Sequence, residues 1–252
     1  MFAQDYFSNE TYLVTGSTSG IGRAVVMNLA KAGAKVVIHG RSDERANEVL
    51  EALPGGPHLV MTKDLCELDS LKDWLKEIVL KTGQLSGFVH SAGMHYMMPA
   101  FLQKPEQFEK IQRVNVSSGI SIAGLLRSKN LRTKNCSVVF VASVMGVVGQ
   151  PAVSAYAASK GALIAATRTL ALEMAPDGLR VNSVSPGQVF SEMTQRQMEK
   201  LPKEQFNKIA AMHPLGIGTT DDVANAVLFL LARDSKWITG SNLIVDGGYT
   251  AA

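Results

Sequence analysis

Tyr156 and Lys160 are the residues of this chain whose types and spacing point most directly to chemistry. They lie four positions apart in an alanine-rich segment expected to form a helix from about Ala155, so they share a helix face. A neighbouring ammonium group favours the phenolate. Lowering a tyrosine pKa from about 10 to near 7 takes roughly 4 kcal/mol, which a charge about 4 Å away supplies at a dielectric of about 20. The pair predicts an acid or base that works near neutral pH.

Ser143 lies upstream of this pair and offers a hydroxyl that could hold a substrate oxygen. It follows an apolar run, residues 138–142, that is typical of a buried strand. A Tyr and a Lys at this spacing also occur by chance, so the pair alone does not establish an enzyme. The interpretation depends on whether the rest of the chain supplies a cofactor site.

The composition is that of an ordinary globular protein, with 46% hydrophobic and 19% charged residues among 252. This length suits one large α/β domain or two small ones, and because no linker or repeat divides the chain we expect a single domain over residues 1–252. The net charge of +3 is small. A basic cluster within residues 127–134 is expected to be a solvated face, so no nucleic-acid partner is predicted.

Two cysteines, Cys66 and Cys136, are far apart in the sequence and lack metal-ligand spacing. A reducing compartment is therefore the simplest setting, and no metal site is expected. No apolar run reaches eighteen residues, and the first ten residues have neither a basic start nor an apolar core. These features argue against a membrane partner or a signal peptide and favour a cytoplasmic protein.

A glycine-rich segment, TGSTSGIG at residues 15–22, follows a short apolar strand and precedes a helix. This layout places backbone N–H groups and a helix N-terminus against a phosphate. Gly16 suits the tight turn, Gly20 allows a close approach of a ligand, and Gly22 allows the helix to pack on the strand. The spacing departs from the common G-x-G-x-x-G, and a tight turn without a ligand remains an alternative.

The second strand, residues 35–39, follows Gly33, which is expected to cap the first helix. Dinucleotide sites place an acid at this strand end for NAD, or an arginine for the 2′-phosphate of NADP. Arg41 and Ser42 occupy this place, whereas Asp43 and Glu44 come later and could begin the next helix. NADP(H) is therefore the preferred cofactor, and NAD(H) remains possible.

Strands and helices then alternate, with helices at residues 45–53 and 68–81 and strands at 58–62 and 87–90. This order predicts a doubly wound parallel sheet whose ligands lie at the carboxyl ends of the strands. Four residues fall at such ends and are candidates to line an adenine and ribose site: Asp64, Ser91, Ala92 and Gly93.

A helical segment after Pro105 carries Asn115, which by itself is more readily a structural polar residue than a catalytic one. The helix that holds Tyr156 should end near residues 175–178. A strand at 179–185 then leads into Pro186 and Gly187. Residues 188–212 interrupt the alternation where substrate lids are usually found, before a last helix at 221–232 and a strand at 242–245.

Together these segments resemble the short-chain dehydrogenase/reductase family over essentially the whole chain. The resemblance rests on TGSTSGIG, Asp64-Leu65, Ser91-Ala92-Gly93, Asn115, Ser143, YAASK, Pro186-Gly187 and the terminal ITGSNLIVDGG, all in order. It implies an NAD(P)-dependent oxidoreductase with a Rossmann-type, doubly wound parallel sheet of seven strands, helices on both faces, and a homotetramer or homodimer.

The resemblance also implies roles for individual residues. Tyr156 would donate or accept the proton, and Lys160 would bind the nicotinamide ribose and lower the tyrosine pKa. Ser143 would orient the substrate carbonyl or hydroxyl, and Asn115 would hold a water that links Lys160 to solvent. The cofactor-binding residues would be Gly16, Ser17, Ser19, Gly20, Ile21, Gly22, Arg41, Ser42, Asp64, Leu65, Ser91, Ala92, Gly93, Tyr156, Lys160, Pro186, Gly187, Val189 and Ser191.

Two departures from the family pattern stand out. His90-Ser91 replaces the usual Asn-Asn, and the missing amide could weaken contacts on the adenosine side, although a serine hydroxyl still offers a hydrogen bond. The threonine that commonly holds the nicotinamide carboxamide is absent after Gly187, and Ser191 is its nearest equivalent.

Within the family the chain is most similar to 3-oxoacyl-(acyl-carrier-protein) reductases. Lys134 favours a carrier-linked substrate, and Asp177, where a basic residue often stands, counts against it. Residues 94–98 and 144–148, with Met193 and Met198, are expected to form an apolar pocket for a ketone or 3-oxoacyl thioester, although core packing also accounts for the methionines. His95 could contact the substrate, but a lone histidine on a loop is more often simply exposed.

Other functions stay open. An alcohol, sugar or steroid dehydrogenase would use the same residues, and a protein that binds NADP without catalysis, as a sensor or partner, is an alternative of another class. A sugar-nucleotide epimerase is disfavoured because the chain leaves little room for a separate substrate domain.

Overall fold

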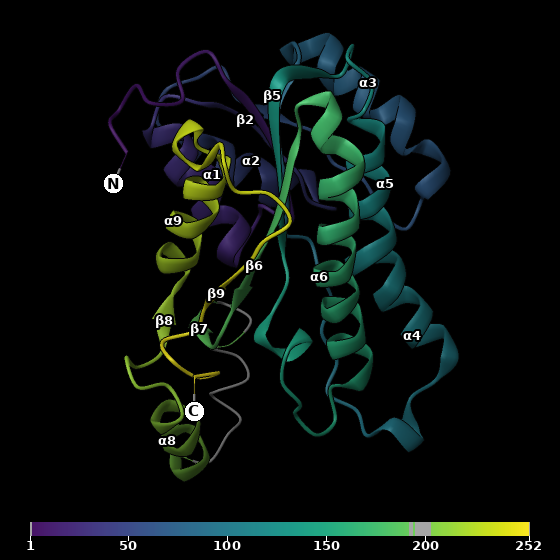
Figure 1. Cartoon of the computed structure of the whole chain (residues 1–252), viewed down its shortest axis with the longest axis vertical. Coiled ribbons are helices and arrows are strands. Elements are labelled where there is room, and N and C mark those ends of the chain that lie inside the picture. Colours follow the sequence, from purple (N-terminus) through teal and green to yellow (C-terminus); the bar gives the residue numbers. More distant parts are fainter. Residues whose placement is uncertain (1, 192–193, 195–202, 252) are drawn as a thin grey trace.

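A seven-stranded parallel sheet forms the centre of the protein, and its strands follow the order β3-β2-β1-β4-β5-β6-β9. The computed structural model describes residues 2–191, 194 and 203–251 (Figure 1). The strands of this sheet are β1 (Thr11–Thr15), β2 (Lys35–Ile38), β3 (Leu59–Val60), β4 (Leu85–His90), β5 (Arg132–Val141), β6 (Arg180–Pro186) and β9 (Asn242–Val245). The expected seven-stranded Rossmann-type sheet is confirmed.

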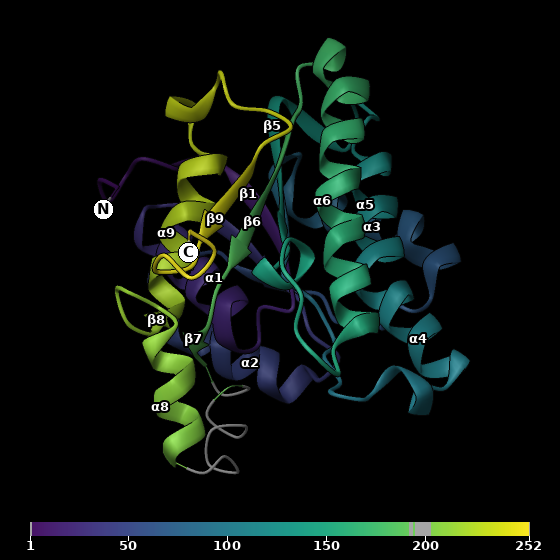
Figure 2. The same ribbon diagram turned by 60° about the horizontal axis from the view of Figure 1, so that its bottom comes forward.

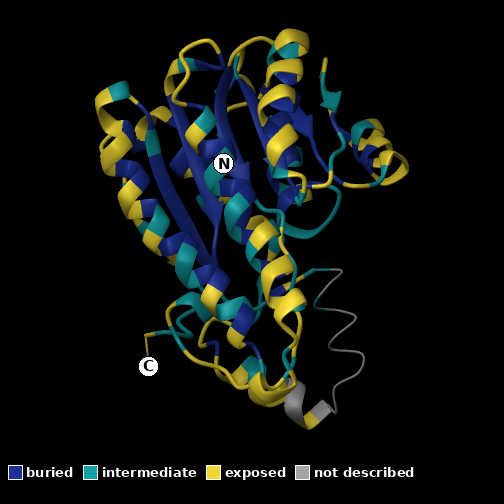
Figure 3. Cartoon of the chain, turned by 90° about the vertical axis from the view of Figure 1, so that its right-hand side faces the viewer, coloured by how far each residue is buried: buried dark blue, intermediate teal, exposed yellow. Residues whose placement is uncertain are grey.

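Helices cover both faces of the sheet (Figure 1). On one face lie α1 (Gly20–Lys31), α2 (Asp43–Ala52) and α9 (Thr220–Leu231), and on the other lie α3 (Leu71–Thr82), α5 (Ser118–Leu125) and α6 (Ser154–Met174). The central strands are therefore buried on both sides, as Figure 3 shows in dark blue. Leu13 faces the second group of helices and Val14 the first, because successive side chains of a strand point to opposite faces.

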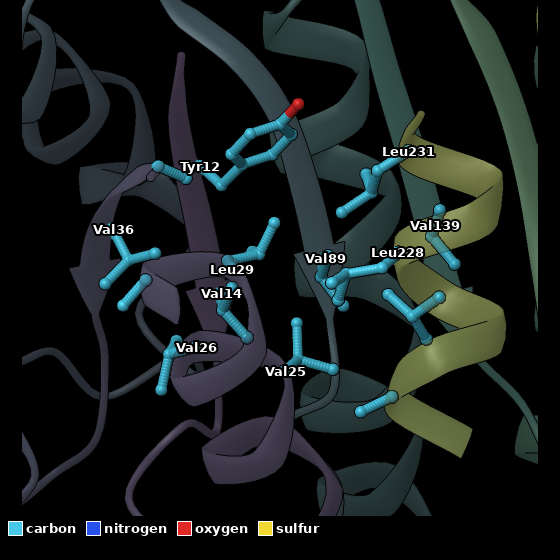
Figure 4. Close-up of a cluster of buried hydrophobic side chains, with 14 of the residues drawn as sticks. Tyr12, Val14, Val25, Val26, Leu29, Val36, Val89, Val139, Leu228 and Leu231 are labelled. Carbon is cyan, nitrogen blue, oxygen red and sulfur yellow. The ribbon is translucent and has the colours of Figure 1, made fainter. Parts of the chain in front are cut away.

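The core between the sheet and the helices α1 and α9 fixes the position of the first helix. Val25 and Leu29 of α1 and Leu228 of α9 pack against Val14 and neighbouring strand residues, and all of them are almost completely buried (Figure 4). Each such side chain contributes about 1.5–3 kcal/mol relative to an exposed one. The start of α1, where the glycine-rich segment ends, is therefore held rigidly against the sheet.

The strand order places a switch point between β1 and β4. From β1 the chain moves outward through β2 and β3, then returns to β4 on the other side of β1 and continues outward through β5 and β6. The loops that leave β1 and β4 consequently diverge, and the crevice between them is where open α/β sheets bind ligands. Figure 2 brings this edge of the sheet forward.

Several expected elements differ in extent. The third strand has two residues rather than five, and the helix expected from Leu68 opens with a short 3-10 turn, Leu68–Ser70. The segment after Pro105 is helical as far as Leu125, as expected, and Asn115 lies inside it, but the π-helical turn Arg113–Ser117 stands between α4 (Pro105–Gln112) and α5. Further 3-10 turns are Ala100–Leu102, Val144–Gly146, Ala175–Asp177 and Arg233–Ser235.

Among the described residues of the segment that interrupts the alternation and of the stretch that follows it, two short strands pair in parallel and one helix forms. They are β7 (Val189–Phe190), β8 (Gly218–Thr219) and α8 (Lys203–Ala211). Met193 and Met198, expected in a substrate lid, lie outside the described residues. In the part of the chain that the structure describes, no helix is long and apolar enough to cross a membrane.

We predict that Leu29→Ala lowers the free energy of unfolding by about 2–5 kcal/mol, because it opens a cavity between α1, α9 and the sheet. Leu80→Ala is the matched control, since this helical leucine is 86% exposed and should change stability by less than about 0.5 kcal/mol. Urea titration followed by circular dichroism measures both. Equal losses in the two variants would contradict the packing described for α1.

Candidate functional site

A cavity of about 1010 Å³ lies at the carboxyl ends of the strands, and loops from both sides of the switch point line it. This volume is at the upper end of those of ordinary ligand pockets. Most of the residues expected from the sequence meet there: Gly16, Ser19, Gly20, Ile21, Arg41, Asp64, Leu65, Ser91, Ala92, Gly93, Ser143, Tyr156, Lys160, Pro186, Gly187, Val189 and Ser191.

Four of the expected site residues lie outside the cavity lining, in supporting positions. The Ser17 hydroxyl is buried and accepts a hydrogen bond from the His39 N–H at 2.9 Å. Ser42 caps α2, where its Oγ accepts from Arg45 N. Gly22 packs beneath the glycine turn, and Asn115 is buried behind Gly93.

The glycine-rich segment has the shape expected of a phosphate cradle. Gly16 has φ +68°, and a Cβ there would lie 2.7 Å from the Ala92 backbone, so no side chain fits. A Cβ on Gly22 would lie 2.4 Å from the Gly16 carbonyl oxygen. Because α1 begins at Gly20 with no acid in its first turn, its positive N-terminal end points toward the cavity without a competing carboxylate.

Lys160 is buried, and within the described residues its ammonium donates one hydrogen bond, to the Val141 carbonyl at 2.7 Å. Burial lowers the pKa of Lys160 to about 8. An ammonium has three donors, and a buried cation is costly unless its donors are used. Lys160 is therefore suited to meet hydroxyls brought by a bound molecule, and with the glycine cradle it fits a nicotinamide dinucleotide.

The expected lowering of the Tyr156 pKa is not found. Burial raises the pKa of Tyr156 above its usual value of 10, and a hydrogen bond with Ser143 acts in the opposite direction. The estimate from the sequence took a full charge about 4 Å away and ignored desolvation. The Lys160 Nζ lies 5.5 Å from the centroid of the Tyr156 ring. Lys160 is itself buried, and this burial disfavours the charged ammonium that would stabilise a phenolate.

Ser143 follows β5 and begins the 3-10 turn Val144–Gly146, where its Oγ accepts from Met145 N at 3.2 Å. Ser143 lines the same cavity as Tyr156, and its role in holding a substrate oxygen stays a prediction. Asn115 binds the loop after Gly93: its Oδ1 accepts from Met94 N at 2.7 Å and its Nδ2 donates to the Met94 carbonyl at 3.0 Å. A water held by Asn115 beside Lys160 stays a prediction.

His95 is not simply exposed, contrary to expectation. Its ring packs edge-on against the Tyr156 ring, with centroids 4.6 Å apart, and is partly buried. Burial and the nearby Lys160 lower its pKa. His95 therefore lies against Tyr156 in the lining of the same cavity.

The expected apolar segments line the cavity only in part. Met94, Met97 and Met145 reach it, whereas Tyr96 and Met98, and residues 146–148, do not. Further lining comes from residues that the sequence did not single out: Pro151, Val153, Ile209, Met212, His213 and Tyr249. His213 stacks on Tyr249 at 4.9 Å between ring centroids, which joins the C-terminal segment to the end of α8.

At the adenosine end of the cavity, sequence reasoning missed two cations and a histidine. Arg45 and Lys63 line it beside Arg41. His39 directly follows β2, and its Nδ1 accepts from Gly16 N at 3.2 Å while its Nε2 lies 3.1 Å from the Lys63 carbonyl. The rule that selected Asp64, a polar residue at a strand end, also applies to His39.

The replacement of the family's usual Asn-Asn by His90-Ser91 leaves the lining of the cavity in place at this point. His90 is completely buried beneath the strand ends and does not line the cavity, whereas Ser91 does. Ser191 also lines the cavity and bonds with Thr194 through their hydroxyls. In the described part of the chain, no three His, Cys, Asp or Glu side chains gather as a metal site.

Lys134 and Asp177 meet at the opposite edge of the sheet. They line a surface hollow of about 520 Å³ with Lys129 and Arg132, at the amino ends of β4, β5 and β6. Asp177 pairs with Arg127 at 3.2 Å. The acid that counted against a carrier-linked substrate is therefore partly neutralised.

The chain is similar to known proteins over almost its whole length. The sequence matches the family described as enoyl-(acyl carrier protein) reductase over residues 16–250. It is 34% identical to a glucose 1-dehydrogenase of Gluconobacter oxydans, covering 98% of this chain and 94% of that protein. It is 33% identical to a 3-oxoacyl-(acyl-carrier-protein) reductase of Rickettsia prowazekii, covering 96% and 97%.

A crystal structure described as ribose-5-phosphate isomerase from Brucella melitensis superposes with a TM-score of 0.90 and 29% identity, covering 99% of this chain and 95% of that one. The chain therefore belongs to the short-chain dehydrogenase/reductase family, and it is an NAD(P)-dependent oxidoreductase. The relatives differ in substrate, so membership does not name the substrate of this chain.

We predict that His39 makes the protein acid-sensitive. Burial lowers the pKa of His39 to about 4, below the usual 6.5, so the unfolded chain takes up the proton first. Its stabilisation is present above about pH 6.5 and is lost, at up to about 1.4 kcal/mol per pH unit, as the pH falls toward 4. Urea unfolding at pH 7 and pH 5 should show a shallower pH dependence in His39→Asn, and an identical slope would refute the assignment.

Proposed function

We propose that the protein reduces a ketone or a 3-oxoacyl thioester to the alcohol with NADPH. The observation that carries the proposal is the placement of Ser143, Tyr156 and Lys160 on one wall of a cavity whose other end holds the glycine cradle and Arg41. Such a cavity can hold a dinucleotide and a carbonyl compound together. We also propose that residues 1–252 act as one nucleotide-binding domain.

The bound nicotinamide would supply a hydride to the carbonyl carbon, and this chain would manage the oxygen. Ser143 and Tyr156 would donate hydrogen bonds to the carbonyl oxygen, and Tyr156 would pass its proton to the developing alkoxide. A raised pKa keeps Tyr156 protonated before the reaction, as a proton donor requires. Lys160 would hold the ribose and stabilise the phenolate that remains, since a nearby cation favours the ionised phenol.

The preference for NADPH is supported by positive charge at the adenosine end. Arg41, Arg45 and Lys63 border the cavity there, and α2 begins next to them. Lys63 pairs with Glu67 at 2.6 Å, and Asp64 lies nearby with its pKa lowered mainly by the Cys66 N–H and also by Arg41. Arg41 is therefore the cation best placed to bind a 2′-phosphate.

The substrate end favours an apolar or mixed carbonyl compound. Met94, Met97, Met145, Val153 and Met212 line it, and methionines fill irregular space around varied substrates. A carrier-linked acyl chain is supported by the relative from Rickettsia prowazekii and by the basic hollow at Lys134. A sugar substrate is supported by the glucose dehydrogenase relative.

We further propose a homotetramer, or a homodimer, as the working assembly. β9 is an edge strand, and the segment from α9 to β9 exposes apolar side chains at Phe229, Trp237 and Ile244. Exposed apolar surface of this kind marks protein interfaces. Analytical ultracentrifugation distinguishes the two assemblies.

We predict that Tyr156→Phe lowers the turnover number by about 10²–10⁴-fold, because the proton donor is lost, while NADPH still binds. NADPH oxidation with a panel of 3-oxoacyl thioesters, ketones and keto-sugars measures turnover, and NADPH fluorescence measures binding. Tyr96→Phe is the matched control, since this exposed tyrosine belongs to the same region but not to the cavity lining. Unchanged turnover in Tyr156→Phe would remove the catalytic role, and NADPH binding without turnover of any substrate would favour the non-catalytic alternative.

We predict that Arg41→Ala weakens NADPH binding by about 10- to 100-fold, because a charged hydrogen bond to the 2′-phosphate is lost. NADH, which has no such phosphate, should bind equally well to both proteins. Arg23→Ala is the control, because Arg23 is exposed on α1 and does not line the cavity. Preferential binding of NADH by the unmodified protein would overturn the assignment of Arg41.

A further inference from the structure

His90 connects the cofactor side of the cavity to the turn that carries Asn115. It is the last residue of β4 and is completely buried. Its Nδ1 lies 2.9 Å from Thr15 Oγ1, and its Nε2 lies 3.2 Å from the Asn115 carbonyl oxygen. Thr15 directly precedes the glycine turn, so the imidazole spans from that turn to the π-helical turn Arg113–Ser117.

These contacts define the tautomer of His90. A carbonyl oxygen only accepts hydrogen bonds, so Nε2 carries the proton and donates to Asn115. Nδ1 is then an acceptor, and the Thr15 hydroxyl donates to it, since its other acceptor, the Val89 carbonyl, lies farther away at 3.4 Å. Thr15 Oγ1 in turn accepts from Ala92 N at 3.3 Å. Burial lowers the pKa of His90 to about 3, so the ring stays neutral.

The resulting chain of hydrogen bonds runs in one direction through groups that border the candidate site. It begins at the Ala92 N–H, passes through the Thr15 hydroxyl and the His90 ring, and ends at the Asn115 carbonyl. The Asn115 side chain then holds Met94 through two hydrogen bonds. A shift of the imidazole would therefore move the π-helical turn and the Met94 loop together.

Gly119 supplies the space for this ring. A Cβ at Gly119, on α5, would lie 2.6 Å from His90 Cδ2 and 2.9 Å from Cγ, closer than real Cβ contacts. His90 is confined on the strand side by Phe140, whose ring centroid lies 6.3 Å away, and by Phe88. The imidazole thus lies between Gly119 and these two aromatic rings, and a methyl group at residue 119 would overlap the place that it occupies.

We propose that His90 is a positioning residue that sets Asn115 and the Met94 loop relative to the glycine turn, and that Gly119 is the space-giving partner that admits its imidazole. The effect on turnover rests on the proposed carbonyl reduction. The tautomer of His90 and the size match between residues 90 and 119 do not depend on that function. Both can be measured on the protein without a substrate.

The size match is tested with a double-mutant cycle of His90→Asn and Gly119→Ala. Gly119→Ala alone should lower the midpoint of thermal unfolding, whereas in the His90→Asn background the same change should have a much smaller effect, because the smaller side chain leaves room for the methyl group. Gly124→Ala, on the same helix with nothing near its added Cβ, is the control. Additive effects of the two substitutions would contradict the match.

The positioning role is tested with His90→Leu, which is close in size to histidine but loses both hydrogen bonds, and with His90→Gln, which keeps a donor. At a temperature where circular dichroism shows both variants folded, His90→Leu should lower the turnover number by about 10- to 100-fold, and His90→Gln should recover part of it. NADPH affinity should fall less than turnover. Normal turnover in folded His90→Leu would overturn the role.

Nitrogen-15 NMR of the histidine rings in the unmodified protein gives an answer that needs neither activity nor a variant. The account expects a neutral His90 ring protonated at Nε2 at pH 6. A ring protonated at Nδ1, or a cationic ring, would overturn the hydrogen-bond chain. If the tautomer and the double-mutant cycle agree but no substrate is reduced, the proposed function fails while the connection between Thr15 and Asn115 stands.

Discussion

The buried ammonium of Lys160 is the constraint on which the site depends. Removing a cation from water is costly, and among the described residues the ammonium donates one hydrogen bond, to the Val141 carbonyl oxygen. The buried ammonium lies at the carboxyl ends of the central strands, where a bound dinucleotide would supply further hydrogen-bond acceptors. Burial lowers the pKa of Lys160 but raises the pKa of the neighbouring Tyr156, so the phenol stays protonated. The pair is thus held as a neutral acid next to a cation of lowered pKa, an arrangement suited to giving a proton to a carbonyl oxygen.

The sheet makes this arrangement possible because it brings distant segments to one edge. β1 and β4 diverge at the switch point, and their loops contribute Gly16 and Gly93 to the same cavity. β5 ends at the turn of Ser143, against which α6 sets Tyr156. The core between α1, α9 and the sheet packs α1 against the strands, and the glycine turn leads directly into this helix.

Much of this fold was predictable from the sequence, because the spacing of apolar residues indicates strands and helices, and glycine and proline residues mark where they end. The alternation of apolar runs and helical patterns predicted the parallel sheet, and the last strand was placed correctly at Asn242–Val245. The π-helical turn around Asn115 was not predictable, since one extra residue in a helix leaves no mark on composition. The raised Tyr156 pKa was missed because desolvation depends on neighbours that only the fold supplies. The fit of His90 into the space at Gly119 joins residues from two elements, so no local pattern shows it.

A structure of the protein with NADPH bound tests the central claim most directly, namely that one cavity joins a cofactor cradle to a proton-donating tyrosine. We expect the 2′-phosphate beside Arg41, the diphosphate at the start of α1, the ribose of the nicotinamide on the Lys160 ammonium, and the nicotinamide ring facing Tyr156. A cofactor bound in the reverse direction, or one whose nicotinamide lies away from Tyr156 and Ser143, would contradict it.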